Sequence, residues 1–584
     1  MTGLVNYEKR KNLNIFQSLE KIDCTKTQNY IPIYRRFFNL NETNYNNVNF
    51  NHTHYIENVT KKLDENMYKC VISHKGKKRD EKVFFKFAPL IDPVKVMIGK
   101  YQYDDTIMTL PQLLSTPSSV NAKILDVNNS AYVDGGFAYL SSQLLSSRDF
   151  IHGIKYYGSF LSIKKNFKVN VFDDLEYMIK SDYFNKNKNK LFEVENYSDY
   201  FDDEASCSNL PPIRIDRTND KLEIGPIEQI GDEIFDNVFT DIVPKKNVDI
   251  DNSTLELISD PLDISSLTKE NVQEHNLQSV NEYSRSVKSD SDSSCSSRTS
   301  HTNSKDEEEL SSDDESGESG DSDDDTEDSE DEIINATMPQ FPVQVICMES
   351  CDNTLDELII DDKLNEEKWL SALMQIIMVL ITYQKAFHFT HNDLHTNNIM
   401  YVHTKKRYLF YKVNNKHYRV PTFGKIFKII DFGRAIYKYD GKVMCSDSFS
   451  PTGDAATQYN IEPYYNSDKP RLEPNYSFDL CRLACSIFDY LVDEMSEIKD
   501  LSKCDPVTRI IVEWCIDDNG INVLYKNNGT DRYPDFKLYK MIARCVHKHT
   551  PMEQLKRREF ADFEFDKNNI AKKEHVMDID NIAM

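Results

Sequence analysis

The sequence predicts an α+β fold of two lobes, one rich in strands and one rich in helices, with a long disordered acidic insert. Three features of the chain carry this prediction. Alternating apolar and aromatic residues predict a β-hairpin over residues 66–88. A helix that is apolar on all sides is predicted over residues 367–387, followed by further helical segments. Between them, the composition changes over residues 192–335, where Ser, Asp and Glu become dominant.

The negative charge of the chain is concentrated in one tract. The 584 residues carry a net charge of −26, and residues 306–332 alone contain 17 Asp and Glu and no Lys or Arg. Removing these 17 acidic residues leaves −9 for the remainder. A body that is itself acidic argues against nucleic acid as the main partner.

Cysteine usage and hydropathy predict a soluble intracellular protein. The 12 cysteines form no C-x-x-C pair, which favours buried thiols in a reducing compartment. The N-terminal stretch up to Lys11 has no apolar segment of the kind found in signal peptides. The longest apolar run, residues 369–383, is interrupted by Ser371 and Gln375 and is too short to span a bilayer, so no membrane partner is expected. The sequence indicates no oligomeric state.

The first lobe is predicted over residues 61–191, after an irregular N-terminal extension over residues 1–60. In the hairpin, the strands MYKCVIS and KVFFKFA flank the loop HKGKKRDE. Alternation places Phe84, Lys86 and Ala88 on one face of the second strand. A lysine in an aromatic strand either meets an anion, such as a phosphate, or lies on an exposed edge strand.

A helix and then a strand are predicted over residues 129–162. Phe137, Leu140 and Leu144 recur at helical spacing before β-branched and aromatic residues follow. Asp134 is the only acidic residue between Val127 and Arg148. Asp134 could pair with Lys86, or it could cap the helix or face solvent.

The acidic low-complexity insert spans residues 192–339 and is expected to loop out of one lobe without breaking its core. Residues 284–332 contain almost no large apolar side chain, so this part should be disordered. It could dock basic partners, or it could be a solvated segment with no specific role.

The core resumes over residues 340–356 with a strand and a connection, VQVICMESCDNTLDELI. The helical lobe is expected over residues 357–565, followed by a frayed tail over residues 566–584. Within this lobe the buried helix over residues 367–387 leads directly to His391. An extra hairpin is predicted within residues 404–421, around Asn414-Asn415.

Three polar residues on the stretch from His391 to Arg434 define the candidate site. Asp393 and Asn398 lie five residues apart in HNDLHTNN, and Asp431 follows the apolar segment KIFKII. Phosphoryl transfer from ATP needs an acid that orients the attacking hydroxyl, and hard oxygen ligands that hold Mg²⁺ against the phosphates. These three side chains could supply both functions.

These two segments resemble the catalytic core of protein kinases. HNDLHTNN is similar to the catalytic loop H-R-D-L-x-x-x-N, and Asp431-Phe432-Gly433 is similar to the D-F-G motif. The surrounding TFGKIFKIIDFGRAIY is most similar to divergent kinase-like proteins of giant nucleocytoplasmic DNA viruses. The resemblance covers roughly residues 65–190 and 340–550.

The resemblance implies a role for each of several residues. Asp393 would be the catalytic base, and His395 could touch the γ-phosphate. Asn398 and Asp431 would hold Mg²⁺. ATP would be bound by Lys86, by Met348 as gatekeeper, by the backbone of Cys351, and by Gly433. His391, Asp479 and Asp134 would have structural roles, with Asp479 anchoring the backbone of the catalytic loop.

The sequence departs from the family pattern at several positions. Asn392 replaces the Arg that pairs with a phosphorylated activation segment, so any activity should not require that phosphate. His395 replaces the usual Lys of Ser/Thr kinases, and the form D-L-H also resembles small-molecule kinases of the aminoglycoside and choline type. Between Gly3 and Gly99 the only glycine is Gly76, so no glycine-rich loop precedes Lys86.

The function expected from the sequence is an ATP- and Mg²⁺-dependent serine/threonine-protein kinase that acts on a protein substrate, with a basic substrate favoured by the acidic tract. The alternatives are a pseudokinase scaffold that binds partners through the acidic insert, a small-molecule kinase, and an acidic chaperone for basic proteins. For a viral kinase, the expected location is the host cytoplasm or the virion.

Overall fold

The computed structural model describes residues 9–50, 53–197, 333–571 and 574–582. All of them belong to one compact unit, Met1–Tyr197 with Ser293–Met584. The predicted disordered tract, residues 284–332, lies outside the described residues. Mixed helix and strand content with a large antiparallel sheet fits a bilobal α+β fold.

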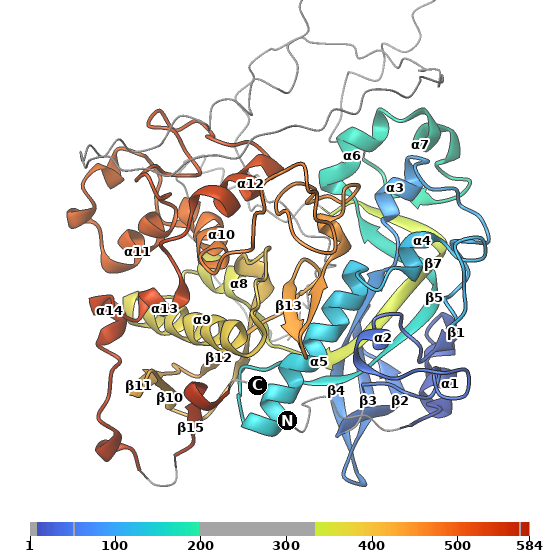
Figure 1. Ribbon diagram of the computed structural model, residues 1–584, viewed down its shortest axis with the longest axis horizontal. Coiled ribbons are helices and arrows are strands. Elements are labelled where there is room, and N and C mark those ends of the chain that lie inside the picture. The colour runs from blue at the N-terminus through green and yellow to red at the C-terminus, as the bar shows by residue number, and fades with distance from the viewer. Residues whose placement is uncertain (1–8, 51–52, 198–332, 572–573, 583–584) are drawn as a thin grey trace, which may run out of the picture. The chain divides into compact units, whose positions relative to one another are not determined.

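The strand-rich part is built on one seven-stranded antiparallel sheet (Figure 1). Its order is β1-β5-β7-β4-β3-β2, with the short β6 also pairing with β7. The long strands β5 and β7 form the centre, and both are largely buried. The strands are β1 Cys24–Gln28, β2 His54–Lys62, β3 Met67–His74, β4 Lys77–Pro89, β5 Tyr156–Asn170, β6 Glu193–Val194 and β7 Asn335–Glu349. The helices of this part are α1 Leu13–Glu20, α2 Tyr34–Phe37, α3 Pro93–Met97, α4 Ala122–Leu125, α5 Ser130–Arg148, α6 Phe172–Ile179 and α7 Asp182–Asn187.

The expected hairpin at residues 66–88 is confirmed, with one difference at its turn. The strands β3 and β4 pair in register from Met67–Phe84 to His74–Lys77. The loop is therefore only Lys75-Gly76, and both residues have positive φ angles of 48° and 78°. Two left-handed residues match the twist of a tight hairpin, so the charged residues expected in a loop extend β4 instead.

Residues 1–60 were predicted as an irregular extension partly packed on the first lobe, but among the described residues β1 and most of β2 belong to the large sheet. Strand β1 pairs with β5, with Cys24 opposite Lys164, and β2 pairs with β3, with His54 opposite His74. Strand β2 pairs with the next strand along the chain, whereas β1 has its partner far along the chain. Local sequence patterns do not reveal the pairing of β1.

Helix α5 lies against the sheet and contains two adjacent glycines that permit close approach (Figure 1). A Cβ at Gly135 would lie 2.2 Å from Nε2 of Gln344 on β7. A Cβ at Gly136 would lie 2.6 Å from the Tyr437 hydroxyl, which donates to Val133 O at 3.1 Å. Glycine weakens a helix interior, but here it lets two side chains reach the helix backbone.

The helix-rich part is centred on α9, which is buried along most of its length. Its helices are α8 Leu355–Ile360, α9 Glu366–Phe387, α10 Phe478–Ile487, α11 Pro506–Trp514, α12 Phe536–Cys545, α13 Pro551–Gln554 and α14 Arg558–Ala561. Three small sheets complete it: β8 Asn353–Thr354 with β9 Ile399–His403 and β12 Lys425–Ile429; β10 Tyr408–Val413 with β11 Lys416–Pro421 and β15 Val576–Asp578; and β13 Ile436–Tyr439 with β14 Lys442–Cys445.

Helix α9 is also relevant to the membrane question. Its 22 residues are long and apolar enough to cross a bilayer. The apolar run of residues 369–383, which was judged too short to span a bilayer, is therefore only part of a longer helix. However, 83 % of its most apolar window is buried inside the molecule, as in the core helix of a globular protein.

The extra hairpin predicted within residues 404–421 is confirmed as β10 and β11, with Asn414-Asn415 in the left-handed turn. The predicted fraying of residues 566–584 is wrong for its described residues. Strand β15 pairs in parallel with β10, and Asp580 accepts hydrogen bonds from the backbone of Asn414 (2.7 Å) and Asn415 (2.9 Å). Met577, Ile579 and Ile582 are buried, which the charged sequence around them conceals.

The boundaries of the insert also differ from the prediction of residues 192–339. Strand β6 pairs with the start of β7, with Val194 opposite Ala336, so both ends of the insert belong to the sheet. Strand β7 begins at Asn335, because the segment NATMPQ pairs with the outer half of β5.

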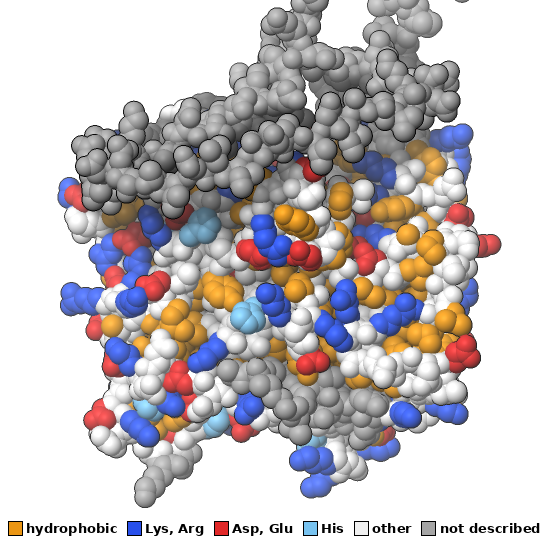
Figure 2. Space-filling model, viewed as in Figure 1, with side chains coloured by type: hydrophobic (Ala, Val, Ile, Leu, Met, Phe, Trp, Pro, Cys, Tyr) orange, Lys and Arg blue, Asp and Glu red, His pale blue; other side chains and the backbone are white. Residues whose placement is uncertain are grey.

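On the face shown in Figure 2, basic and acidic side chains are interspersed, without one large patch of either sign.

Candidate active site

The buried carboxylate of Asp479 fixes the backbone of the loop between α9 and β9. Asp479, the second residue of α10, accepts hydrogen bonds from the backbone N–H groups of His391 and Asn392, each at 2.9 Å. His391 in turn donates from Nε2 to Ile430 O at 2.9 Å, which links this loop to the segment that contains Asp431. A carboxylate that accepts two backbone hydrogen bonds fixes the loop, since a buried charge needs such partners.

The side-chain amide of Asn398 links the backbone of Asp393 to the side chain of His395. Its Nδ2 donates to Asp393 O and to His395 Nε2, both at 2.9 Å. Because a carbonyl oxygen can only accept, the nitrogen of the amide must face it, and Oδ1 is directed elsewhere. Asn398 also accepts on its own carbonyl from Ile430 N at 3.0 Å, so it lies beside the residue that precedes Asp431.

Lys86 connects the two parts of the molecule. Its Nζ lies 2.8 Å from Asp134 Oδ2 on α5 and 2.8 Å from Asp431 Oδ1. The ion pair with Asp134, one of the alternatives left open by the sequence, is therefore present. The other oxygen of Asp134 accepts from Phe432 N at 3.0 Å. Asp134 thus fixes both the lysine and the backbone beside Asp431.

An aromatic cluster joins α5 to the loop that carries His391 and to the segment that carries Phe432. The ring of Phe137 stacks on Phe389 with a centroid distance of 4.2 Å and contacts Phe432 at 4.6 Å. Phe432 also lies 5.8 Å from the ring of His391. Packed aromatic rings of this kind keep the three segments in one arrangement.

The charges of the site shift the pKa values of its groups in opposite directions. Burial raises the pKa of Asp134, and Lys86 only partly opposes this. Burial acts in the same sense on Asp431, but the Lys86 ammonium brings the Asp431 pKa below its usual value. The two carboxylates raise the pKa of Lys86 despite its burial. The Lys86 ammonium thus prevails over burial at Asp431, whereas burial prevails at Asp134.

Asp393 and His395 also have shifted pKa values. Burial alone would raise the pKa of Asp393, but the Arg434 guanidinium, with Arg482 and a hydrogen bond from Tyr539, holds it below its usual value. Burial lowers the pKa of His395 to about 4. His395 is therefore neutral near pH 7, which agrees with its role as acceptor from Asn398. A neutral imidazole offers no positive charge to a phosphate.

The remaining predicted residues lie along the connection between the two parts. In the β4–β7 pair, Met348 lies opposite Phe84, and Lys86 lies two residues further along β4. Residues two apart on a strand point to the same side, so Met348, Phe84 and Lys86 share one face of the sheet. Cys351 is half-buried, just beyond the end of β7. Gly433 donates from its N–H to Asp431 Oδ1 at 3.3 Å. Their roles in nucleotide binding stay predictions.

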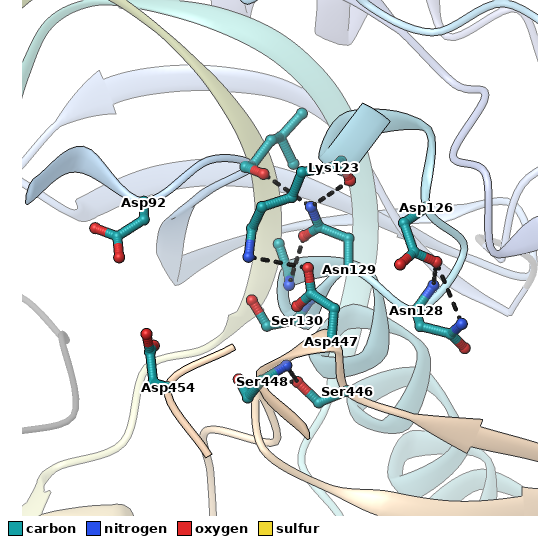
Figure 3. A network of polar contacts seen from close by, with 12 residues as sticks. Asp92, Lys123, Asp126, Asn128, Asn129, Ser130, Ser446, Asp447, Ser448 and Asp454 are labelled. Carbon is teal, nitrogen blue, oxygen red and sulfur yellow. Dashed lines mark hydrogen bonds and ion pairs between the residues drawn. The ribbon is translucent and has the colours of Figure 1, made fainter. Parts of the chain in front are cut away.

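One network near the site was missed by the sequence analysis (Figure 3). Asp447, after β14, accepts from Ser130 N at the start of α5 and from Lys123 Nζ, both at 2.9 Å. Its own N–H donates to Asn128 O at 2.7 Å. The carboxylate lies at the N-terminal end of a helix, where negative charge is stabilised. An Asp in the polar segment SDSFSPTGD gives no local signal of this contact.

Three other residues that the sequence analysis missed lie around Asp393. The Tyr539 hydroxyl, from α12, donates to Asp393 Oδ1 at 2.8 Å, and Arg482 Nε donates to the same hydroxyl at 2.9 Å. Arg434 Nη1 lies 3.6 Å from Asp393 Oδ1. Arg434 and Arg482 were within reach of sequence analysis, because each lies within three residues of a predicted motif. Tyr539 had no such signal.

Comparison with known proteins gives short similarities only. No family model matches the chain. The chain is 33 % identical over 95 residues to the serine/threonine-protein kinase haspin of Mus musculus, covering 16 % of this chain and 13 % of haspin. It is 35 % identical over 77 residues to the haspin of Bos taurus, covering 13 % and 10 %. These stretches span a small part of either relative and support, at most, a relationship to the kinase-like superfamily.

Proposed function

We propose that this protein has a protein-kinase-like fold and transfers the γ-phosphoryl group of ATP to Ser or Thr of a protein substrate. The observation that carries the proposal is the position of Lys86, with its Nζ 2.8 Å from both Asp134 and Asp431. A lysine so placed, beside a carboxylate that can hold a metal, is what the binding of nucleotide phosphates requires. The partial similarity to a serine/threonine-protein kinase supports the same proposal.

The residues present fit ATP with Mg²⁺. The contacts of Asp431 with Lys86 and Gly433 use Oδ1, and Oδ1 of Asn398 is directed away from its own two acceptors. Among the described residues, no cluster of three or more His, Cys, Asp or Glu could hold a metal alone. This suits Mg²⁺, which takes one or two protein oxygens and completes its shell with phosphate and water. When bound, Mg²⁺ would neutralise charge on the phosphates.

The side chains of the chain itself would do the rest by position and charge. Asp393 would accept the hydrogen bond of the substrate hydroxyl and then its proton. Lys86 would stabilise the negative phosphates. Asn398, His391 and Asp479 would hold the loop so that these groups need little rearrangement. The low pKa of Asp393 keeps it ionised, as a base must be.

We also propose that activity does not require phosphorylation of the segment after Asp431. Asn392 donates to Arg434 O at 3.0 Å and accepts from the Tyr459 hydroxyl at 2.8 Å. Asp447 already occupies the end of α5 with Lys123. The segment is thus held by neutral hydrogen bonds and by a native carboxylate. If the protein is viral, a location in the host cytoplasm or a virion belongs to this proposal.

A second candidate, a pseudokinase that binds partners without catalysis, is favoured by one observation. The turn between β2 and β3 is Leu63–Asn66, which contains Asp64 and Glu65 and no glycine. Backbone N–H groups of a glycine-rich turn would attract phosphates, whereas two carboxylates repel them. Nucleotide binding without turnover would be the mark of this function.

The proposed function is tested by phosphotransfer from labelled ATP and Mg²⁺ to a basic acceptor protein and to the chain itself. Asp393→Asn should lower the rate by about a hundredfold or more, because the substrate hydroxyl loses its base. Asp361→Asn is the matched control, since it neutralises an exposed carboxylate that forms an ion pair with Lys363. This variant should keep the rate of the wild type.

Two outcomes would contradict the kinase proposal. Label that is absent from all three proteins, while ATP still raises the melting temperature, would favour the pseudokinase. Equal label in the wild type and Asp393→Asn would exclude Asp393 as the base and assign the transfer to another site or to a contaminating enzyme.

A further inference from the structure

Helix α12 places a tyrosine hydroxyl where an acceptor hydroxyl would have to bind. Tyr539 OH lies 2.8 Å from Asp393 Oδ1, within the range over which a general base contacts the group it deprotonates. Arg482 Nε donates to the Tyr539 oxygen at 2.9 Å, so the proton of this hydroxyl is directed to Asp393. In the proposed reaction, the substrate hydroxyl must donate a hydrogen bond to this same carboxylate.

The contact also closes the base from solvent. Asp393 is only 3 % exposed and Tyr539 only 1 %. The Arg434 guanidinium lies 5.6 Å from the centre of the Tyr539 ring, and Phe536 stacks on that ring at 5.0 Å. The side chain of a protein Ser or Thr cannot reach a carboxylate enclosed in this way unless Tyr539 moves.

The element that carries Tyr539 is held to the protein by few side chains. Along the ten residues of α12, only Tyr539, Ile542 and Ala543 are buried. The preceding residues 517–535 form turns and are mostly half-buried or exposed. Segments with few buried apolar contacts open at low free-energy cost. Opening of α12 should therefore cost less free energy than opening of a helix that is buried along most of its length, such as α9.

The helix is also connected to the segment that follows Asp431. Arg544 Nη2, at the end of α12, donates to Thr457 O at 3.0 Å, and Asn475 Nδ2 donates to Ala543 O at 3.3 Å. A change in that segment would therefore act on α12 directly.

We propose that α12 is an autoinhibitory gate over the acceptor side of the site, with Tyr539 occupying the position of the substrate hydroxyl on Asp393. This inference rests on the proposed function. A protein acceptor and Tyr539 compete for one carboxylate, so the closed state raises the KM for the acceptor and leaves the ATP side unchanged.

The test compares the wild type with Tyr539→Phe and Tyr539→Ala in steady-state transfer from ATP and Mg²⁺ to protamine, a basic protein, and to casein, an acidic one. Tyr539→Phe keeps the ring and removes only the competing hydroxyl. It should lower the KM for the better acceptor by about tenfold, since a hydrogen bond to a charged group is lost from the closed state. The kcat and the KM for ATP should not fall. Tyr539→Ala should lower the acceptor KM further.

The matched control is Tyr525→Phe. The Tyr525 hydroxyl also donates to a carboxylate, Asp489 Oδ1 at 2.9 Å, in the same part of the molecule but without contact to Asp393. This variant should leave both KM values unchanged.

The outcomes separate the gate from its alternatives. A kcat that falls tenfold in Tyr539→Phe, with KM unchanged, would overturn the gate and make Tyr539 a positioning residue for Asp393. Unchanged constants in both variants would show that the gate is not closed in solution, while the kinase proposal would stand. No transfer by any of the four proteins would overturn the proposed function itself. In that case, hydrogen exchange tests whether Tyr539 contacts Asp393. Faster exchange over residues 536–545 in Asp393→Ala than in the wild type supports the closed gate, and unchanged exchange overturns it.

Discussion

Asp393 illustrates how a single residue obtains its contacts from distant parts of the chain. Its carboxylate contacts Tyr539 and Arg434, and its backbone carbonyl accepts from Asn398. The motif HNDLHTNN indicated that Asp393 and Asn398 lie in one loop, because spacing within a loop is a local property, and their functional roles stay predictions. The contact with Tyr539 joins residues 146 positions apart. No periodicity or motif links them.

His152 gives a prediction of pH dependence at the residue scale. It is fully buried between Phe427 O (2.7 Å from Nδ1) and the Tyr411 hydroxyl (2.7 Å from Nε2), and burial lowers its pKa from 6.5 to about 4. Below pH 6.5 the unfolded chain binds a proton that the folded protein binds only near pH 4. The contribution of His152 to the free energy of unfolding is therefore complete above pH 6.5 and is lost as the pH falls toward 4, by roughly 3 kcal/mol.

The measurement is urea-induced unfolding of the wild type and His152→Gln at pH 7.5 and pH 4.5. At pH 7.5 the wild type should have a larger free energy of unfolding than His152→Gln. At pH 4.5 this difference in the free energy of unfolding should be smaller by about 2–3 kcal/mol. A difference that stays constant between the two pH values would mean that His152 is not the buried, neutral group described here.

At the scale of elements, α5 combines a weak helix sequence with tight packing. The sequence predicted the helix from Phe137, Leu140 and Leu144, and the structure confirms it over Ser130–Arg148. Nothing in the sequence explained the two glycines of this helix. In the structure, the side chains of Gln344 and Tyr437 approach the helix backbone at these two positions, where a Cβ atom would clash.

This packing predicts the effect of Gly135→Ala. Alanine favours a helix, but the new Cβ would lie 2.2 Å from Gln344 Nε2. Overpacking should outweigh propensity and lower the free energy of unfolding by about 1–3 kcal/mol. The control is the same substitution in a Gln344→Ala background, where the clash is absent and the cost should largely vanish. Equal costs of Gly135→Ala in the two backgrounds, measured by urea unfolding, would show that Gln344 does not set this requirement for glycine.

At the scale of the whole molecule, the two ends of the insert lie side by side in the large sheet. Val194 and Ala336 are neighbours in the β6–β7 pair, and Glu195 N donates to Asn335 O at 3.0 Å. A connection between adjacent antiparallel strands needs only a few residues. The structure of the remaining chain therefore does not depend on the length of what lies between.

Replacing residues 198–332 with a Gly-Ser linker of about six residues should leave a folded protein. The free energy of unfolding should not fall, because a shorter loop closes at a smaller entropic cost. Phosphotransfer should persist if the protein is a kinase, whereas any binding of basic partners through the acidic tract should disappear. Loss of a cooperative thermal transition in the shortened protein would instead assign a structural role to the removed residues.

The sequence by itself determined the elements and motifs that depend on neighbouring residues. It predicted the hairpin of β3 and β4, helices α5 and α9, the Asn414-Asn415 turn, and the loop that carries Asp393 and Asn398. Each follows from periodicity, turn chemistry or spacing within about twenty residues, because local backbone preferences act over that range.

Tertiary structure alone decided the features that require partners far along the chain. The edge strand β1, strand β15, the ends of the insert, the anchor at Asp447 and the contact of Tyr539 with Asp393 all pair segments that the sequence leaves unrelated. The choice of Asp134 as the partner of Lys86 belongs to the same group. Such pairings are decided by which groups become buried together, since a buried strand edge or charge must find a hydrogen-bond or ion-pair partner, and a linear sequence does not specify which partner lies nearby.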